Sequence, residues 1–247
     1  MAYETRANQI LELLHRNGTV QASHISELLQ VSLVTVRKDL QRMEDEGLLR
    51  RTHGGAALRG TENHQDPRIT AMERIAEAAA AQIQAGDCVI MNAGNTTLMT
   101  ARKLLGRKNL TIITNSIAIA RELVQQTGIK LIFLGGEVNA EAVFTYGWDA
   151  VTQLEQYKAN KLIMSASGLS CSSGLTTRHM EAADLLRKMI ARTETVIAVA
   201  DESKIGYESF YHVGDLGAVD MLITNATQTT DPELERMQRM GIQVYRC

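Results

Sequence analysis

The feature that most constrains the fold is a repeated alternation of short apolar runs and amphipathic stretches, which begins near residue 69 of this 247-residue chain. Parallel strands read as continuous apolar runs because helices bury both faces of their sheet. Alternation of such strands with helices is typical of a doubly wound α/β domain with a mostly parallel sheet. We therefore expect strands at residues 88–91, 110–113, 130–134, 161–164, 196–200, 221–224 and 243–245, and helices at 69–83, 96–105, 116–126, 148–157, 180–191 and 231–240.

The start of the chain has a different sequence pattern. Residues 1–55 read as short helices, and the polar segment that follows contains Pro67, one of two prolines in the chain. Proline in a polar segment between periodic stretches is a linker signal. The sequence thus predicts a small domain at residues 1–56, a linker at 57–68 and a larger domain at 69–247.

Composition excludes several classes of protein. The net charge is −2, so DNA contact requires a local patch rather than an overall cationic field. The three cysteines, Cys88, Cys171 and Cys247, are far apart and lack metal-ligand spacing. No apolar stretch is long enough to span a bilayer. We expect a cytoplasmic protein with reduced thiols, no metal, no cofactor and no membrane contact.

The small domain contains a helix-turn-helix pattern. Helices are expected at residues 6–17, 22–30 and 33–46, and glycines end the first and the third, at Gly18 and Gly47. Ser32 is a suitable N-cap for the third helix. The 3.6-residue period predicts that these helices pack through Ile25, Leu28, Leu29, Leu33, Val36, Leu40 and Met43.

The opposite side of the third helix carries Thr, Arg, Lys and Gln, which suit the major groove of DNA. After Gly47, the sequence LLRRTHGG indicates a short β-wing near the phosphates. Residues 37–51 hold five basic side chains. A helical bundle with a solvated basic face, or a module that binds another protein, would share this pattern. The predicted DNA-binding residues are Ser32, Val34, Thr35, Arg37, Lys38, Gln41, Arg42, Arg50, Arg51 and His53.

A detailed signature spans about 50 positions of this region. Its residues are Arg6, Ile10, Glu27-Leu28, Val31-Ser32, Thr35-Val36-Arg37-Lys38-Asp39-Leu40, Glu44, Gly47 and His53-Gly54-Gly55-Ala56. This signature resembles that of the DeoR family of bacterial repressors. The resemblance implies a winged helix-turn-helix with residues 32–42 as the recognition helix. Lys38 stands where many members have Arg, and Lys lacks the bidentate fork of Arg.

Polar loops follow the expected strands of the larger domain. Residues 94–97 place Gly, Asn and two Thr at a helix N-terminus, where free N–H groups can hold a phosphate. Ligands of open α/β sheets bind at the carboxyl ends of strands, so these loops should converge on one crevice. The predicted effector-binding residues are Asn92, Gly94, Asn95, Thr96, Thr97, Thr114, Asn115, Ser116, Gly135, Gly136, Gly168, Asp201 and Lys204, and Arg178, His179 and Glu181 can edge the site.

The DeoR resemblance continues through these loops and covers nearly the whole chain. It implies an effector domain similar to ribose-5-phosphate isomerase that binds phosphorylated sugars or related intermediates. Family members often have an acid at position 92 and Ser or Thr at position 95, where this chain has Asn92 and Asn95. An Asn keeps hydrogen bonding but lacks the carboxylate.

The leading hypothesis is a repressor of a sugar catabolic operon that binds double-stranded operator DNA, is switched by a phosphorylated sugar, acts at the nucleoid and is at least a dimer. The alternative is a sugar-phosphate isomerase with an accessory DNA-binding arm. Its base would be Glu137, Glu141 or Asp201, since Asn92 cannot take up a proton. Each loop residue also has a structural interpretation: Asn92 and Asn115 as helix caps, Asp201 and Lys204 as a surface pair, and Gly135 and Gly136 as turn residues.

Overall fold

The computed structural model describes residues 3–52, 54–58, 67–226 and 232–247. The chain divides into two compact units, Met1–Ile69 and Thr70–Cys247. Across the described residues, no helix is both long and apolar enough to cross a membrane.

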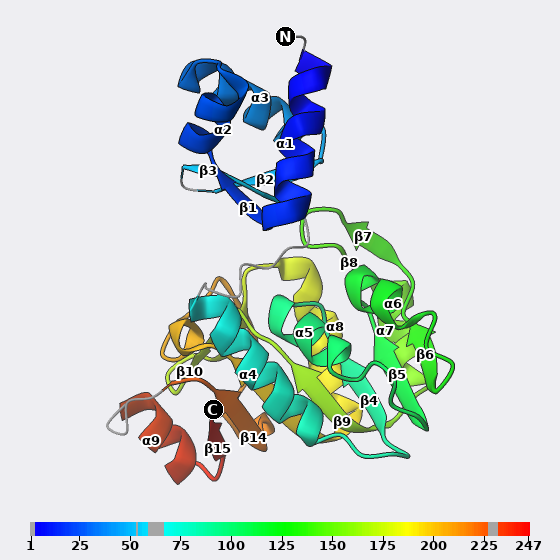
Figure 1. Cartoon of the computed structure of the whole chain (residues 1–247). Coiled ribbons are helices and arrows are strands. Elements are labelled where there is room, and N and C mark those ends of the chain that lie inside the picture. Colours follow the sequence, from blue (N-terminus) through cyan, green and yellow to red (C-terminus); the bar gives the residue numbers. More distant parts are fainter. Residues whose placement is uncertain (1–2, 53, 59–66, 227–231) are drawn as a thin grey trace. The chain divides into compact units, whose positions relative to one another are not determined.

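The first unit is a three-helix domain with a small antiparallel sheet (Figure 1). Its sheet has the strand order β1-β3-β2. The expected helices and wing are confirmed, and β1 is an addition because its three residues carry too little pattern to be recognised. In chain order the elements are α1 (Tyr3–Asn17), β1 (Thr19–Gln21), α2 (Ala22–Leu29), α3 (Leu33–Asp45), β2 (Leu49–Thr52) and β3 (Gly55–Leu58).

The core of this unit differs from the prediction at two leucines. Leu28 is 54% exposed and Leu33 is 42% exposed, so neither belongs to the core. Both lie at the margin of the apolar face, where the helical period alone does not fix burial. Asp39 is buried instead, in an ion pair described below. The remaining predicted core residues, Ile25, Leu29, Val36, Leu40 and Met43, are buried.

The segment predicted as a linker is partly structured at both ends. Ala57 and Leu58 belong to β3, where they pair with Arg50 and Leu49 of β2. Pro67 is the first residue of α4 (Pro67–Ala81), a position that proline favours because its missing N–H has no helical partner there. Residues 59–66 lie outside the described residues. The domain boundaries at 56, 57–68 and 69 stay a prediction.

The second unit is built on a seven-stranded parallel sheet with the order β15-β14-β12-β9-β4-β5-β6. All seven predicted strands are present, which confirms the doubly wound α/β fold. The chain winds outward from β4 through β5 and β6, then returns to β9 beside β4 and winds the other way. The strands are β4 (Cys88–Met91), β5 (Leu110–Thr114), β6 (Ile129–Phe133), β9 (Ala159–Met164), β12 (Thr193–Ala200), β14 (Met221–Thr224) and β15 (Gln243–Arg246).

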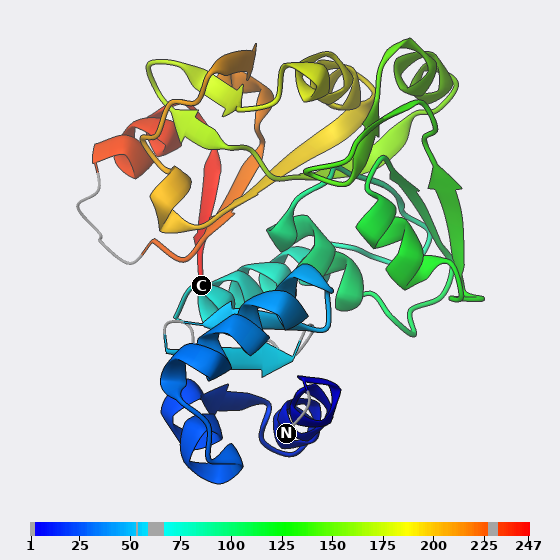
Figure 2. The ribbon, with the colours of Figure 1, turned by 90° about the horizontal axis from the view of Figure 1, so that it is seen from above.

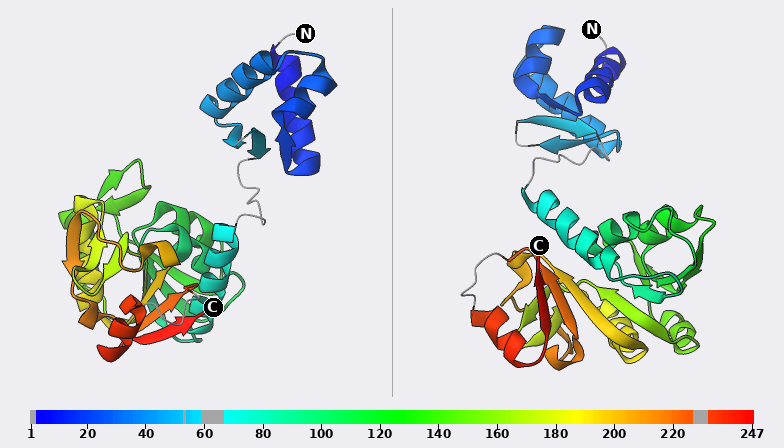
Figure 3. Two further views of the ribbon diagram at one scale, coloured as in Figure 1. Left: turned by 90° about the vertical axis from the view of Figure 1, so that its left-hand side faces the viewer. Right: turned by 60° about the horizontal axis from the view of Figure 1, so that its bottom comes forward.

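Helices cover both faces of this sheet, as alternation of strand residues requires. Val89 and Met91 pack with α4, α5 (Asn95–Arg102) and α6 (Ile117–Leu123). Ile90 points the other way, into a core shared with α7 (Trp148–Glu155), α8 (Met180–Ala191) and α9 (Pro232–Arg239). Figure 2 shows the two helical layers, and Figure 3 shows α4 and α9 on opposite sides of the sheet.

Two small antiparallel sheets were not predicted. One is the hairpin of β7 (Glu137–Asn139) and β8 (Phe144–Tyr146). The other joins β10 (Gly168–Ser170), β11 (Gly174–Thr177) and β13 (Tyr211–Gly214). Their strands are three or four residues long and rich in Gly, Ser and Thr, so they lack the apolar runs that identify the main sheet.

Candidate functional site

The recognition helix α3 begins as the sequence predicts. The Ser32 hydroxyl accepts the Thr35 N–H at 3.1 Å, and the two side-chain oxygens lie 2.9 Å apart. An N-cap of this kind contributes about 1 kcal/mol to helix stability. The hydroxyls of Ser32 and Thr35 therefore serve first to define where the helix starts.

An ion pair that the sequence analysis missed anchors α3 to α1. Arg6 donates to both carboxylate oxygens of Asp39, at 2.6 and 2.9 Å, and hydrogen bonding to that carboxylate raises the pKa of Arg6. Their side chains are only 13% and 8% exposed. Both residues stand in the signature of the resemblance, and this pairing gives that signature a physical reason.

Three predicted DNA-contacting side chains on α3 project freely. Val34 is 61% exposed, and Arg37 and Lys38 are also exposed. Among the described residues, neither Arg37 nor Lys38 has a side-chain hydrogen bond or ion pair. Two unpaired cations and an apolar side chain on one helix surface can meet phosphates, guanine edges and a thymine methyl.

The next turn of α3 is tied into the domain. Gln41 donates to Asp45 at 3.0 Å and accepts from Arg51 of the wing. Arg42 donates to Glu46 at 2.9 Å, and its guanidinium lies 3.9 Å from the centre of the Tyr3 ring. The structure thus gives Gln41, Arg42 and Arg51 structural roles beside their predicted DNA contacts.

Among the described residues of the wing, Arg50 is the basic side chain that stays free. Arg50 on β2 is exposed and unpaired within the described residues. The Arg51 N–H donates to Glu44 of α3 at 2.8 Å, which docks β2 on the recognition helix. His53, also predicted to approach DNA, lies outside the described residues.

The second candidate site lies where the strand order of the large sheet reverses, between β4 and β9. Asn92, directly after β4, is buried and bridges to the loop after β9. Its amide donates to Ser165 O at 2.8 Å, and its side-chain oxygen accepts the Ser165 N–H at 2.9 Å. Asn92 therefore holds two strand-end loops together at the point where ligands of such sheets bind.

The loop at residues 94–97 is shaped by its neighbours. A Cβ on Gly94 would lie 2.0 Å from the Ser165 hydroxyl, so a larger residue there would require that hydroxyl to move. The Thr97 hydroxyl donates to Asn92 O and Gly94 O, at 2.8 and 2.9 Å. Thr96 is buried, while Asn95 is exposed. The loop thus offers backbone N–H groups of the first turn of α5 to a ligand, and its Thr97 side chain is engaged internally.

The loop after β5 is similarly self-supporting. Asn115 accepts the Ala93 N–H at 3.2 Å and donates to Thr145 O at 2.8 Å. Thr114 donates to Met91 O at 2.7 Å, and Ser116 caps α6 through the Ile119 N–H. The structure brings these predicted residues together beside residues 92–97, and their side chains hold the loops to one another.

The predicted glycines allow close approach of two chain segments. Gly136 has φ of +130°, and a Cβ there would lie 2.4 Å from Tyr146 O of the β7–β8 hairpin. A Cβ on Gly168 would lie 2.2 Å from Tyr207 O. The Gly135 N–H donates to Gln153 at 3.0 Å. Gly136 therefore lets the chain pass close to the β7–β8 hairpin, Gly135 is held by Gln153 of α7, and the effector contacts of both stay a prediction.

The loop after β12 supplies a cation. Asp201 caps a single 3-10 turn, η1 (Glu202–Lys204), by accepting the Ser203 N–H at 2.9 Å. Asp201 and Lys204 do not form the surface pair considered from the sequence. The Lys204 side chain is partly exposed and unpaired within the described residues, which leaves it free to bind an anion.

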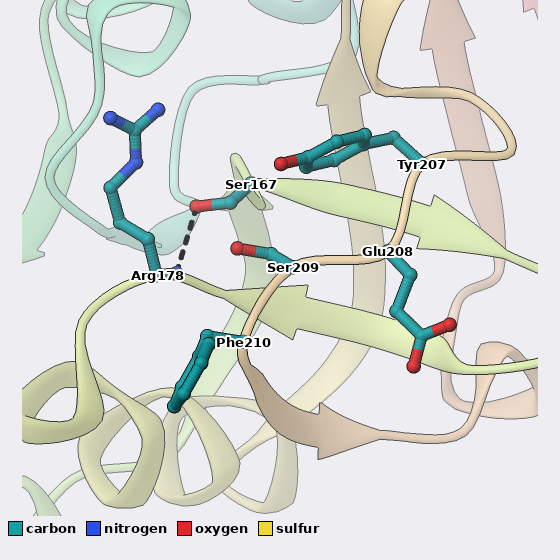
Figure 4. Close-up of a pocket in the computed structure, with 6 residues that line it drawn as sticks. All are labelled: Ser167, Arg178, Tyr207, Glu208, Ser209 and Phe210. Atoms are coloured by element: carbon teal, nitrogen blue, oxygen red, sulfur yellow. Dashed lines mark hydrogen bonds between the residues drawn. The ribbon is translucent and has the colours of Figure 1, made fainter.

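A pocket of about 660 Å³ adjoins these loops and was not predicted, although Arg178 had been placed at the edge of the site. The backbone N–H of Arg178 donates to the Ser167 hydroxyl at 3.2 Å. Figure 4 shows the hydroxyls of Ser167, Tyr207 and Ser209 pointing toward the side on which Arg178 lies, and the Glu208 carboxylate pointing away. Glu208 and Phe210 complete the lining.

Comparison with known families gives two matches. Residues 6–62 match the model of a DeoR-like helix-turn-helix domain. Residues 68–226 match the model of the DeoR C terminal sensor domain.

Several curated proteins are similar over nearly their whole length. The HTH-type transcriptional repressor GlcR of Bacillus subtilis is 36% identical over 91% of this chain and 89% of its own. A putative aga operon transcriptional repressor of Escherichia coli O157:H7 is 31% identical over 97% of this chain and 92% of its own. The glycerol-3-phosphate regulon repressor of Escherichia coli K12 is 28% identical over 92% of each chain.

Solved structures show more distant similarity. Ribose 5-phosphate isomerase A of Methanocaldococcus jannaschii aligns with a TM-score of 0.40 and 15% identity, over 54% of this chain and 52% of the isomerase. The probable sor operon regulator of Shigella flexneri aligns with a TM-score of 0.40 and 9% identity, over 67% of this chain and 85% of the regulator.

Proposed function

The chain belongs to the DeoR family of transcription regulators, and from this premise we propose that it represses a sugar or sugar-derivative operon by binding operator DNA through α3 and the β2–β3 wing. The observation that carries this proposal is the exposed surface of Val34, Arg37 and Lys38, whose two cations have no partner in the described part of the chain, on a helix anchored by the Arg6–Asp39 ion pair. A recognition helix has to be rigidly seated and free on its outer side, and α3 meets both requirements.

The direct test is operator binding by the variant Arg37→Ala plus Lys38→Ala. Loss of two cations that contact DNA should weaken binding at least about ten-fold and reduce the salt dependence of the affinity by about two phosphate contacts. Lys103→Ala plus Lys108→Ala removes the same charge from exposed positions of the sensor domain and serves as the control. Equal affinity of both variants for a selected operator duplex contradicts the assignment of α3.

The sensor domain is proposed to bind a phosphorylated sugar or a close derivative. The first turn of α5 offers backbone N–H groups beside the switch point of the sheet, and Lys204 supplies a positive charge that no described residue pairs with. Helix N-termini and free cations are the two groups that proteins commonly direct at phosphate.

Sensing, rather than turnover, fits the side chains of the crevice. Asn92 has no carboxylate, and its amide is committed to Ser165. Asp201, a candidate base of the isomerase alternative, caps the η1 turn. We therefore propose a regulator without isomerase activity, and measurable isomerisation of a pentose or hexose phosphate contradicts it.

Helix-turn-helix proteins read paired half-sites as symmetric oligomers, so we propose at least a homodimer that acts at the nucleoid in the cytoplasm. Light scattering of the purified chain measures the assembly. A monomer that binds a palindromic operator as a single copy contradicts this proposal.

A further inference from the structure

The pocket lined by Ser167, Arg178, Tyr207, Glu208, Ser209 and Phe210 has no role in the function proposed above, and its chemistry is distinctive. Arg178 is exposed, and its guanidinium is unpaired among the described residues. Three hydroxyl groups point toward the same side (Figure 4). A planar cation surrounded by hydroxyl groups suits a carboxylate or phosphate.

The segments that line the pocket run directly into two of the strand-end loops. Ser167 follows Ser165, the partner of Asn92, by two residues, and two residues of extended chain span at most about 7 Å. On the other side, the Tyr207 backbone N–H donates to Lys204 O at 3.4 Å. The pocket therefore lies next to the loops that follow β9 and β12.

The Tyr207 segment is also held firmly against the neighbouring sheet. The Gly206 N–H donates to Leu169 O at 2.7 Å, and the Ser209 N–H donates to the Thr176 hydroxyl at 2.9 Å. These bonds fix both ends of the lining segment to β10 and β11. The pocket is thus a preformed part of the sensor domain, as small-molecule sites usually are.

From this arrangement we propose that the effector carries a second anionic group, a carboxylate or a phosphate, at the end remote from its phosphate, and that Arg178 pairs with this group in the pocket. The inference rests on the proposed sugar-phosphate sensor and specifies the class of molecule that it recognises. The hydroxyls of Ser167, Tyr207 and Ser209 bind the polar atoms that flank the second anion.

The test compares singly and doubly anionic sugars by calorimetry on the full chain. Three matched pairs serve as probes: glucose 6-phosphate with 6-phosphogluconate, fructose 6-phosphate with fructose 1,6-bisphosphate, and ribulose 5-phosphate with ribulose 1,5-bisphosphate. In at least one pair, the doubly anionic member should bind about ten-fold tighter or more, as expected for one charge-assisted pair. The pair that shows this preference tells a carboxylate from a phosphate.

Arg178→Gln should abolish the preference and leave binding of the singly anionic member unchanged. Arg178→Lys should keep part of it, because Lys retains the charge without the bidentate fork. Arg239→Gln, at a 75% exposed side chain paired only along its own helix, removes the same charge and should change nothing. Because Arg178 is exposed and unpaired, the melting temperature without ligand should stay at the wild-type value.

The outcomes distinguish the role of Arg178 from the sugar-phosphate sensor itself. Binding of sugar phosphates with no preference for a second anion, or a preference that survives Arg178→Gln, overturns the role of Arg178 and leaves the sugar-phosphate sensor standing. Failure of all six probes to bind the wild-type chain overturns the sensor proposal and this inference together.

Discussion

At the scale of single residues, polar side chains in the sensor domain are committed before any ligand arrives. Asn92 and Asn115 each satisfy backbone groups of a second segment, so they position loops whose N–H groups remain available. Lys204 and Arg178 differ from these amides, since both side chains are free among the described residues. Ligand recognition should thus depend on these two cations, and loop geometry on the two amides.

Replacement of Asn92 tests this division of roles. Asn92→Ala removes the partner of the part-buried N–H and C=O of Ser165, and each lost bond costs about 1–3 kcal/mol, so the free energy of unfolding should fall by about 2–6 kcal/mol. Asn95→Ala, three residues along and exposed, should change it by less than about 0.5 kcal/mol. Urea unfolding of both variants measures the difference, and similar midpoints contradict the bridging role.

The thiol of Cys171 gives a prediction about reactivity. Burial, and secondarily a hydrogen bond with Glu233, raise the pKa of this thiol to about 11. A raised pKa leaves little thiolate at neutral pH, and the thiolate is the form that reacts. Alkylation of Cys171 by iodoacetamide should therefore be slow at pH 8 and accelerate up to pH 11, as peptide mass spectrometry can follow.

The cause of this shift can be tested separately. Glu233→Gln removes the negative partner and should lower the pKa of Cys171, which speeds alkylation at pH 8. Glu235→Gln, two residues away on an exposed part of α9, is the matched control. Rapid labelling of wild-type Cys171 at pH 7 contradicts the prediction.

At the scale of elements, the parallel strands were predictable and the small antiparallel sheets were not. Because both faces of the sheet are buried, β4 and β12 are continuous apolar runs. Such a run can be recognised from the sequence of the strand alone. The pairing of β11 with β13 joins segments more than 30 residues apart, such as Thr177 with Tyr211, and leaves no local signature. The pocket lined by Arg178 adjoins these paired strands, which is why the sequence pointed to Arg178 and not to the other lining residues.

In the recognition helix, the sequence pattern predicted the buried apolar face and the N-cap, but it did not predict the buried charge on that face. Periodicity correctly placed Val36, Leu40 and Met43 inside, and it assigned Leu33 to the same side although that residue is exposed. Asp39 is buried because Arg6 of α1 reaches it, a tertiary contact that no period encodes. Likewise, Gln41 and Arg42 are residue types that often contact DNA, and in this structure they also form hydrogen bonds within the domain, to Asp45 and Glu46.

The cap of α3 allows stability and DNA binding to be separated. Ser32→Ala removes the acceptor for the Thr35 N–H and should lower stability by about 1 kcal/mol. Ser32→Asp keeps an N-cap and should retain stability, yet its negative charge at the start of the recognition helix should weaken operator binding more than Ser32→Ala does. Thermal unfolding and operator titration measure the two effects, and unchanged operator affinity of Ser32→Asp places Ser32 away from DNA.

At the scale of the whole molecule, a DNA-binding unit and a sensor unit in one chain imply a thermodynamic coupling. If the effector and operator DNA favour different states of the protein, each lowers the affinity for the other by the same factor, commonly about 5–150-fold. The size of that factor is limited by how differently the effector binds the two states. Lys204, with its free charge in the sensor unit, is the side chain through which we expect most of the phosphate's contribution to arise.

This coupling gives the last prediction. Saturating sugar phosphate should weaken binding of wild-type protein to its operator, and operator DNA should weaken effector binding by an equal ratio, as titrations in both directions can show. Lys204→Ala should lose the response while its operator affinity without effector stays unchanged, because Lys204 lies in the sensor unit. Lys103→Ala, an exposed cation of the same unit, should respond as wild type does. An effector that binds tightly and leaves operator affinity unchanged would show that the two units are not coupled, since equal affinity for both states shifts no equilibrium.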